Sequence, residues 1–420
     1  MKILHVTNYF RDAHEHVGGA EQAAYRTALL ARENGCEVSV VTTVPNRAGS
    51  PEFRVRPVPL CEDYLPGVLR KYVEAAKWYS LQADPLASRA FKRILAEEGP
   101  DVVHFHNCQF LTLSLLEAAG KAGARTIASI YDYWFFCPTV MLVAPDSRFC
   151  SRAHGPWCIH CLPEGMRSIQ KILLSVRRKV MDRYMEMVDG FHVLSEHSRS
   201  VLAGYGIPRG KIHVAPLTLP IEYTRMPDSA EPADPNEILF VGWLNERKGV
   251  HRLLEAMPQV LQGHPEARLT VIGGRVRFGD AYEKKMNAII DAGGVRGRVT
   301  FAGHRHPAEV KRFLQRAAVV VIPEQYENMS PLLMIEAMVM KRPLVISRVG
   351  GVPEFIEHGV TGWLADHLSP SDFARCILKV LKDLDEAAEV AERAQKAILL
   401  KCDGRAVWAA TRLMYEGGPG

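Results

Sequence analysis

The chain has no long apolar segment and no strong excess of charge. Its 420 residues contain no run that approaches the roughly 20 apolar residues needed to span a bilayer. The formal net charge is only +5 and is spread along the chain, which gives no argument for nucleic acid as a partner. The apolar run at residues 1–9 stops too early for the core of a secretory signal. We interpret that run as a first β-strand.

The cysteines are distributed too unevenly along the chain for the disulfide framework of a secreted protein. Nine cysteines are an odd number, and four of them crowd into residues 137–161 while the others are scattered. Disulfide frameworks belong to oxidising compartments and use paired, regularly spaced cysteines. We therefore expect a cytoplasmic protein that is soluble or at most peripheral at a membrane.

The length and composition indicate two folded domains. Single hydrophobic cores stop growing at roughly 250–300 residues, and longer chains divide. A hydrophobic content of 47% and a charged content of 24% are near the averages of globular proteins. The chain can therefore bury two sizeable cores.

Apolar runs of strand length alternate with helical patterns, which is typical of parallel sheets in α/β proteins. A polar, proline-rich stretch at 226–236 separates two series of such runs. We predict two doubly wound, Rossmann-like domains, 1–222 and 223–395, that face each other across a cleft. The predicted strands are 3–7, 37–43, 102–106, 126–130 and 190–194 in the first domain, and 238–241, 268–272, 299–302, 318–322 and 343–347 in the second.

Glycines and cations follow several of these strands, where open α/β sheets bind ligands. Gly18 and Gly19 open a helix, and a helix N-terminus offers free N–H groups to phosphate. Arg247 and Lys248 precede another helix, where cations oppose the helix dipole unless an anion binds between them. A plain tight turn and a solvated pair of cations are the alternatives.

Two carboxylates flank the loop after the strand at 318–322. Glu327 and Glu336 can accept hydrogen bonds from ribose or sugar hydroxyls, while the N–H groups around Ser330 and Leu332 can face a phosphate. The alternative for Glu336 is an ordinary carboxylate on a helix surface.

In order and spacing, these segments resemble the retaining glycosyltransferases of family four, which have the GT-B fold. The resemblance covers nearly the whole chain. It is carried by Gly18–Glu21, Asp101–His106, Tyr131–Pro138, Phe240–Val250, Leu269–Gly274, Val299–His304, Tyr326–Met338 and Val349–Gly362.

The resemblance implies transfer of a sugar from a UDP-, GDP- or ADP-sugar to a hydroxyl of a glycan or lipid-linked acceptor. No catalytic metal is implied. The first domain is then the acceptor side, the second binds the nucleotide sugar, and a C-terminal helix over 396–420 crosses back to the first domain.

The resemblance also implies roles for single residues. Lys248 and Arg247 hold the donor diphosphate, and Glu336 holds the ribose. Glu327 contacts the transferred sugar, and Gly18 with Gly19 lines the phosphate side of the cleft.

The sequence departs from the family pattern at three places. Eight residues separate Glu327 from Glu336, where seven are usual, and Trp243 stands where Arg is common. Tyr131-Asp132 replaces the His-Asp whose histidine lies beside the reacting sugar. A tyrosine, with a pKa of about 10, is a poor base. The resemblance implies a front-face mechanism that needs no strong protein base, because the leaving phosphate takes the acceptor's proton. We take Tyr131, Asp132 and Glu327 as the catalytic candidates.

The crowded cysteines are candidate metal ligands, since four thiolates with one C-x-x-C pair can bind Zn²⁺ tetrahedrally. Such a site has no open position and is structural. It would fold the insert between Tyr131 and about Pro163, beside the acceptor. Unligated thiols and an iron–sulfur cluster are the alternatives. The candidate ligands are Cys137, Cys150, Cys158 and Cys161, with His154 and His160 nearby.

Three other functions are alternatives. A sugar epimerase of the same fold also binds a nucleotide sugar. A non-catalytic binding relative is favoured by Tyr131 and Trp243 but opposed by Lys248 and Glu336. A nucleic-acid-binding zinc protein needs basic and aromatic surroundings that the cluster lacks.

The sequence at 166–188 predicts a basic amphipathic helix, which either lies on anionic lipid or packs on the core.

Overall fold

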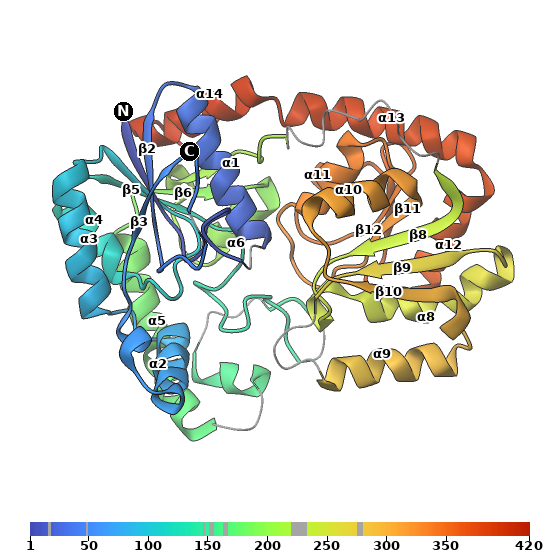
Figure 1. Cartoon of the computed structure of the whole chain (residues 1–420), viewed down its shortest axis with the longest axis horizontal. Coiled ribbons are helices and arrows are strands. Elements are labelled where there is room, and N and C mark those ends of the chain that lie inside the picture. Colours follow the sequence, from blue (N-terminus) through green and yellow to red (C-terminus); the bar gives the residue numbers. More distant parts are fainter. Residues whose placement is uncertain are drawn as a thin grey trace. The chain divides into compact units, whose positions relative to one another are not determined.

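The chain folds into two compact units in the computed structural model, which describes residues 1–15, 18–47, 49–145, 148–150, 155–162, 167–219, 233–274 and 280–420. Unit 1 comprises Met1–Thr218 together with Gly404–Gly420, and unit 2 comprises Leu219–Asp403 (Figure 1). The sequence predicts boundaries after residues 222 and 395. Most of the predicted connector at 226–236 lies outside the described residues.

Unit 1 contains a seven-stranded sheet in which all neighbouring strands are parallel. The strand order is β3-β2-β1-β4-β5-β6-β7, so the order reverses between β1 and β4. The strands are β1 (Lys2–Val6), β2 (Glu37–Thr42), β3 (Arg54–Pro57), β4 (Val102–Phe105), β5 (Arg125–Ser129), β6 (Gly190–Val193) and β7 (Ile212–Val214).

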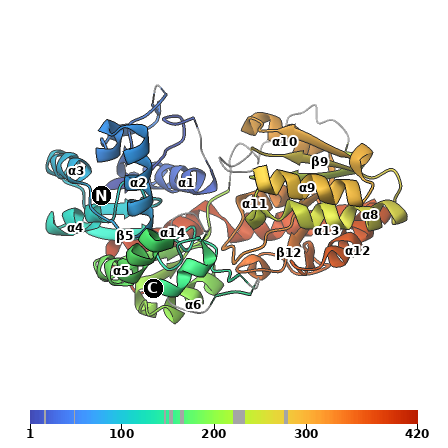
Figure 2. The ribbon, with the colours of Figure 1, turned by 90° about the horizontal axis from the view of Figure 1, so that it is seen from below.

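Helices α3 and α4 of unit 1 lie side by side (Figure 2). The signals for α3 are local: Asp84 caps its first turn by accepting the Ala87 N–H at 2.9 Å, Pro85 opens it, and Gly99 ends it with a left-handed φ of 57°. The helices are α1 (Gly19–Glu33), α2 (Gly67–Tyr79), α3 (Pro85–Glu98), α4 (Ser114–Lys121), α5 (Arg167–Glu186), α6 (Glu196–Gly204) and α14 (Gly404–Glu416), with 3₁₀ turns η1 (Cys61–Tyr64), η2 (Pro156–Cys161) and η4 (Arg209–Lys211).

The C-terminal helix α14 belongs to the core of unit 1. Met414 and Tyr415 are buried against Ile3 of β1, Val102 of β4 and Ile127 of β5. The side chain of Arg125 donates to the Met414 carbonyl at 3.0 Å. Unit 1 is therefore built from two separate stretches of the chain.

Unit 2 contains a six-stranded parallel sheet of order β10-β9-β8-β11-β12-β13, which reverses between β8 and β11. Helices α8 and α12 pack side by side on it. The strands are β8 (Asp234–Val241), β9 (Arg268–Ile272), β10 (Val299–Gly303), β11 (Ala317–Ile322), β12 (Leu344–Ser347) and β13 (Trp363–Ala365). The helices are α8 (Val250–Gly263), α9 (Asp280–Ala292), α10 (Pro307–Arg316), α11 (Leu332–Val339), α12 (Pro370–Lys382) and α13 (Leu384–Lys401), with 3₁₀ turns η5 (Glu246–Lys248), η6 (Arg296–Arg298) and η7 (Val352–Glu354).

The predicted fold class is confirmed, since both units are doubly wound α/β structures with parallel sheets. All ten predicted strands are present within a few residues of their predicted bounds. The prediction missed three short strands, β3, β7 and β13, which lie at sheet edges.

Candidate active site

The candidate donor residues of unit 2 lie at the reversal of its strand order. Lys248 follows β8, and Glu324 follows β11, the neighbouring strand in the sheet. Crevices at such reversals, outside the carboxyl ends of the strands, are where open α/β sheets bind ligands. The Lys248 ammonium forms an ion pair with the Glu324 carboxylate across this point.

Backbone geometry holds Lys248 in place. Asn245 caps the turn by accepting the Lys248 N–H at 3.0 Å. Gly249 follows with a left-handed φ of 69°, and a Cβ there would lie 1.8 Å from the Pro323 carbonyl oxygen. Only glycine allows the loops after β8 and β11 to approach this closely.

The local charges keep Lys248 protonated. Burial by itself disfavours the ammonium, but the Glu324 carboxylate outweighs this effect and raises the pKa of Lys248. The Lys248 side chain is still 23% exposed, whereas that of Glu324 is 3% exposed. A ligand can therefore reach the cation, while its counter-ion stays beneath the surface.

Arg247 and Tyr326 complete this cationic group. The Arg247 guanidinium lies 5.1 Å from the centre of the Tyr326 ring, and the Lys248 ammonium lies 5.6 Å from it. Both distances are within the range of cation–π attraction. The two cations of the predicted diphosphate site thus share one aromatic neighbour.

The loop from Glu324 to Ser330 is held by Asn328. Its side-chain amide donates to Glu324 and to the Tyr326 hydroxyl, and its side-chain oxygen accepts the Ser330 N–H at 3.1 Å. Glu327 is also buried in this loop, at 8% exposure. The buried Ser330 hydroxyl has no hydrogen-bond partner among the described residues.

The remaining predicted donor residues lie on α11. Leu332 is its first residue, and Glu336 lies one turn further on; both are partly exposed. Glu324, Tyr326 and Asn328 are residues of this loop to which the sequence assigned no role. Their signal is position, since Glu324 lies two residues beyond β11.

An open pocket of about 940 Å³ lies in unit 2 at the ends of β9 and β10, and Leu244 from the loop after β8 also lines it. Gly273 and Gly274 form part of its wall, and Phe301 and His304 contribute rings. A Cβ on Gly273 would lie 1.8 Å from the Gly242 carbonyl oxygen, so this glycine is needed where the loops approach closely. Trp243, the residue in place of the family's Arg, lies 6.4 Å from the His304 ring.

Two of the predicted residues of unit 1, Gly18 and Gly19, lie after β1, at the reversal of its strand order. Gly18 caps α1, and its N–H donates to Glu21 at 2.8 Å; Gly19 is exposed in the first turn. The Asn107 side chain, beyond β4, donates to the other oxygen of Glu21 at 3.2 Å. Burial raises the pKa of Glu21. Glu21 thus joins the loops that follow β1 and β4.

Tyr131 and Asp132 line a small hollow in unit 1, about large enough for a water molecule. The Tyr131 hydroxyl lies 2.9 Å from Nδ1 of His106, which lines the same hollow. Asp132 accepts the Trp134 N–H at 2.9 Å. Burial raises the pKa of Tyr131 to about 12, so this side chain is a neutral phenol.

The four clustered cysteines lie in unit 1, with Cys158 and Cys161 on η2. Burial raises the pKa of both η2 thiols, and Cys137 and Cys150 raise it further. In the described ranges, a set of three ligand atoms within 4.8 Å of one another occurs only at a group of histidines. The four sulfurs do not form such a set, and zinc stays a prediction.

The fold is that of the GT-B glycosyltransferases. A solved structure of Anabaena HepE in complex with UDP superposes with a TM-score of 0.70 at 17% identity, covering 98% of this chain and 99% of that one. Two family models match adjoining parts: Glycosyltransferase Family 4 over residues 17–222, and Glycosyl transferases group 1 over residues 224–397. Each model matches one part of the chain, and both describe glycosyltransferases.

Curated relatives match shorter segments. An uncharacterized glycosyltransferase of Methanocaldococcus jannaschii is 34% identical over 168 residues, which is 40% of this chain and 41% of the relative. Glycogen synthase of Mycobacterium tuberculosis is 30% identical over 182 residues, 43% of this chain and 42% of the relative. The chain thus spans about two fifths of the length of these relatives.

Among the described residues, no helix has both the length and the apolar character needed to cross a membrane.

Proposed function

We propose that the chain is a retaining glycosyltransferase that moves a sugar from a nucleotide-sugar donor to a hydroxyl of a glycan or lipid-linked acceptor. The observation that carries this proposal is the cationic group at the strand reversal of unit 2. Lys248 is exposed enough to meet a ligand and is kept charged by Glu324. Preorganised cations of this kind stabilise a departing diphosphate.

The other donor contacts follow from the same loop. The Ser330 and Leu332 N–H groups lie at the start of α11, where phosphate binds well. Glu336 takes the ribose hydroxyls and Glu327 the transferred sugar. We assign the nucleotide base to the pocket beside Phe301 and His304, because an exposed aromatic ring can stack on a base.

In unit 1 we assign Gly18 and Gly19 to the donor phosphates, and Tyr131 and Asp132 to catalysis. The raised pKa of Tyr131 leaves it unsuited as a general base. The reaction then uses the leaving phosphate to take the proton of the acceptor hydroxyl, and no catalytic metal is needed.

We also propose a structural zinc ion held by Cys137, Cys150, Cys158 and Cys161. Arg177 supports it: this guanidinium is fully buried, it donates to the carbonyls of Trp78, Tyr79 and Trp134, and no carboxylate pairs with it within the described residues. Burial lowers its pKa to about 10, and the nearby thiols Cys137 and Cys158 oppose that shift. Asp132 acts on Arg177 only weakly, and a tetrathiolate zinc site, which carries two negative charges, would supply further counter-charge.

For a lipid-linked acceptor we propose peripheral binding of the cytoplasmic protein to a membrane. Helices α2 and α5 of unit 1 are in contact and expose both apolar and basic side chains. Val68 and Leu69 on α2 are 70% and 54% exposed, and Ile172 on α5 is 69% exposed. Lys71 and Lys171 are exposed beside them. This combination suits an anionic lipid surface.

The test is a thermal-shift screen of the purified protein against UDP-, GDP- and ADP-sugars, since a ligand that binds only the folded state raises the Tm. One donor is expected to raise the Tm of the wild type and of Lys341→Ala, an exposed control in unit 2, but much less that of Lys248→Ala. Product analysis with that donor and a hydroxyl acceptor must then show a glycosylated acceptor. Release of nucleotide with an isomerised free sugar would instead identify an epimerase, and binding without turnover a non-catalytic relative.

A further inference from the structure

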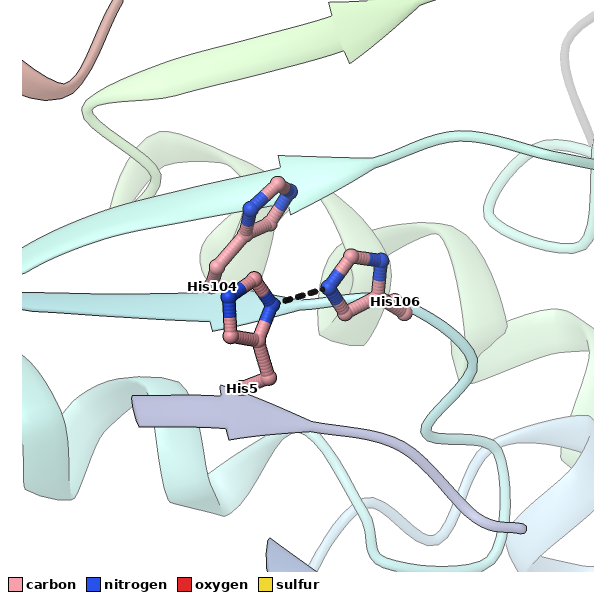
Figure 3. A group of neighbouring side chains, drawn as sticks. All are labelled: His5, His104 and His106. Atoms are coloured by element: carbon pink, nitrogen blue, oxygen red, sulfur yellow. Dashed lines mark hydrogen bonds between the residues drawn. The ribbon is translucent and has the colours of Figure 1, made fainter. Parts of the chain in front are cut away.

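Three buried histidines lie together on one face of the unit 1 sheet (Figure 3). His5 on β1 is the register partner of His104 on β4. His106 is two residues further along the chain, and alternate residues of a strand point to the same face. All three are 5% exposed or less. Strand interiors of this kind are normally apolar, so the ring nitrogens need partners.

Most of the ring nitrogens of these histidines already have hydrogen-bond partners, which disfavours metal binding by the three residues. His104 uses both nitrogens, at 2.7 Å from the Tyr415 hydroxyl and 2.8 Å from Ser129 Oγ. His106 uses both, at 2.7 Å from Nδ1 of His5 and 2.9 Å from the Tyr131 hydroxyl. Only His5 Nε2 has no partner among the described residues. A metal ion would have to break at least two of these bonds, and three neutral imidazoles would bring it no negative charge.

The bonds of His104 have a fixed direction. His192 Nε2 lies 2.8 Å from the Ala215 carbonyl oxygen, which can only accept, so this nitrogen carries the proton. His192 Nδ1 therefore accepts the only proton of Ser129, at 2.8 Å. Ser129 in turn accepts from His104 Nε2, and His104 Nδ1 accepts from Tyr415. Both ring nitrogens of His104 are thus occupied, Nε2 as a donor to Ser129 and Nδ1 as an acceptor from Tyr415 of α14. His104 therefore cannot donate a proton to His5 or His106.

The second chain, from His5 through His106 to Tyr131, has two proton arrangements. If Tyr131 donates to His106 and His106 donates to His5, then His5 is left with a buried, unpaired N–H. If His5 donates to His106 and His106 donates to Tyr131, the unpaired atom is a bare lone pair. Orphaned buried N–H groups are the rarer of the two. The second arrangement is therefore favoured.

In that arrangement the Tyr131 oxygen accepts from His106, and its own proton points elsewhere. Two other hydroxyls act on Tyr131, those of Ser129 and Thr27. Ser129 gives its proton to His192, and Thr27 donates to the Ala23 carbonyl at 2.9 Å. Neither can therefore replace His106 as a donor to the phenol; each can only accept the proton of Tyr131 when no ligand oxygen takes it.

We propose that His5 and His106 are positioning residues that hold the Tyr131 hydroxyl as a hydrogen-bond donor toward the hollow it lines, for an oxygen of the bound sugar or acceptor. This inference rests on the proposed transferase function for its ligand but not for its proton arrangement. Burial lowers the pKa of His5 to about 3 and that of His106 well below its usual value. The relay therefore stays neutral near pH 7.

The direct test is ¹⁵N NMR of the histidine-labelled full chain, which distinguishes protonated from bare ring nitrogens and needs no activity. We expect His5 and His106 as Nδ1–H tautomers, and His104 and His192 as Nε2–H tautomers that serve as internal controls. The spectra of His5→Gln and His106→Asn assign the signals. A His106 ring protonated at Nε2 and bare at Nδ1 would overturn the proposal, whether or not the protein transfers sugar.

The functional test is a double-mutant cycle with Tyr131→Phe. His106→Leu removes the donor to the phenol, whereas His106→Asn keeps an N–H near the position of Nδ1. We expect His106→Leu to lower kcat about tenfold with KM within about twofold, His106→Asn to restore most of kcat, and His106→Leu to cost nothing further in the Tyr131→Phe background. An equal loss in both backgrounds would show a merely structural role and refute the positioning role. Donor-induced Tm shifts, measured in parallel, report on unit 2 and show separately whether the proposed function fails.

Discussion

Replacing Tyr415 by Phe tests how α14 is held in unit 1. The change removes only the hydroxyl that donates to His104 Nδ1 at 2.7 Å. The ring can keep its edge-on contacts with His104 at 5.5 Å and Trp408 at 6.3 Å. Because the Ser129 bond fixes the His104 tautomer, Nδ1 is left as a buried acceptor without a partner.

The expected cost follows from that orphaned nitrogen. Leaving a buried acceptor unpaired costs about 1–3 kcal/mol, and 1 kcal/mol shifts the Tm of a unit of this size by about 2–4 °C. A central value of about 2 kcal/mol gives a fall of about 4–8 °C. Scanning calorimetry at pH 8, where buried imidazoles are neutral, measures it.

Tyr72→Phe is the matched control, because Tyr72 is 50% exposed in the same unit. The Tyr72→Phe change removes a solvated hydroxyl and should alter the free energy of unfolding by no more than about 0.5 kcal/mol. A Tyr415→Phe protein that melts with the wild type would refute the directed chain from Tyr415 to Ala215, and with it the assignment of His104.

Four further predictions concern the site and the fold. Lys248→Ala and Glu336→Ala should each lower turnover more than tenfold, or about 1.4 kcal/mol of transition-state stabilisation, with circular dichroism unchanged; wild-type rates in both would refute the assignment. Glu324→Gln removes the carboxylate that raises the pKa of Lys248, so burial then dominates and the alkaline limb of the pH–rate profile should move to lower pH; an unmoved limb would show that Lys248 does not act as a cation. Elemental analysis should find close to one zinc ion per wild-type chain and little zinc in Cys158→Ser. The control Cys376→Ser should keep its zinc. Wild-type protein that is prepared without chelator and contains neither zinc nor iron would refute the proposed metal site. Deleting residues 396–420 should destabilise unit 1 and abolish activity, and unchanged melting would contradict the packing of α14.

The sequence predicts the fold well where strands are apolar. Runs such as Val319–Ile322 are buried on both faces, and continuous apolar segments are the signal of central parallel strands. The missed strands lack that signal: β3 reads Arg-Val-Arg-Pro, and β7 and β13 have only three residues each. Edge strands are fixed by pairing with a neighbour that is distant in sequence, which a local pattern does not contain.

The site was predictable where its chemistry is local. Arg247 and Lys248 are adjacent and follow a strand, so their pattern is visible in one window. Glu324 was missed because its partner Lys248 is 76 residues away. The histidines of β1 and β4 are visible in the sequence as polar residues in otherwise apolar strands. Buried polar side chains must find hydrogen-bond partners, so their pattern indicates a buried hydrogen-bond network.

The two separate stretches that form unit 1 have a consequence for synthesis on the ribosome. Domains generally fold in the order in which they emerge, and all seven strands of unit 1 emerge before unit 2. Its sheet must nevertheless wait for Met414 and Tyr415, which follow the whole of the uninterrupted unit 2 in the chain. Unit 1 is therefore translated first but completes its folding last. Until α14 has docked, His104 and the apolar side chains that α14 covers are exposed to solvent or available to a chaperone.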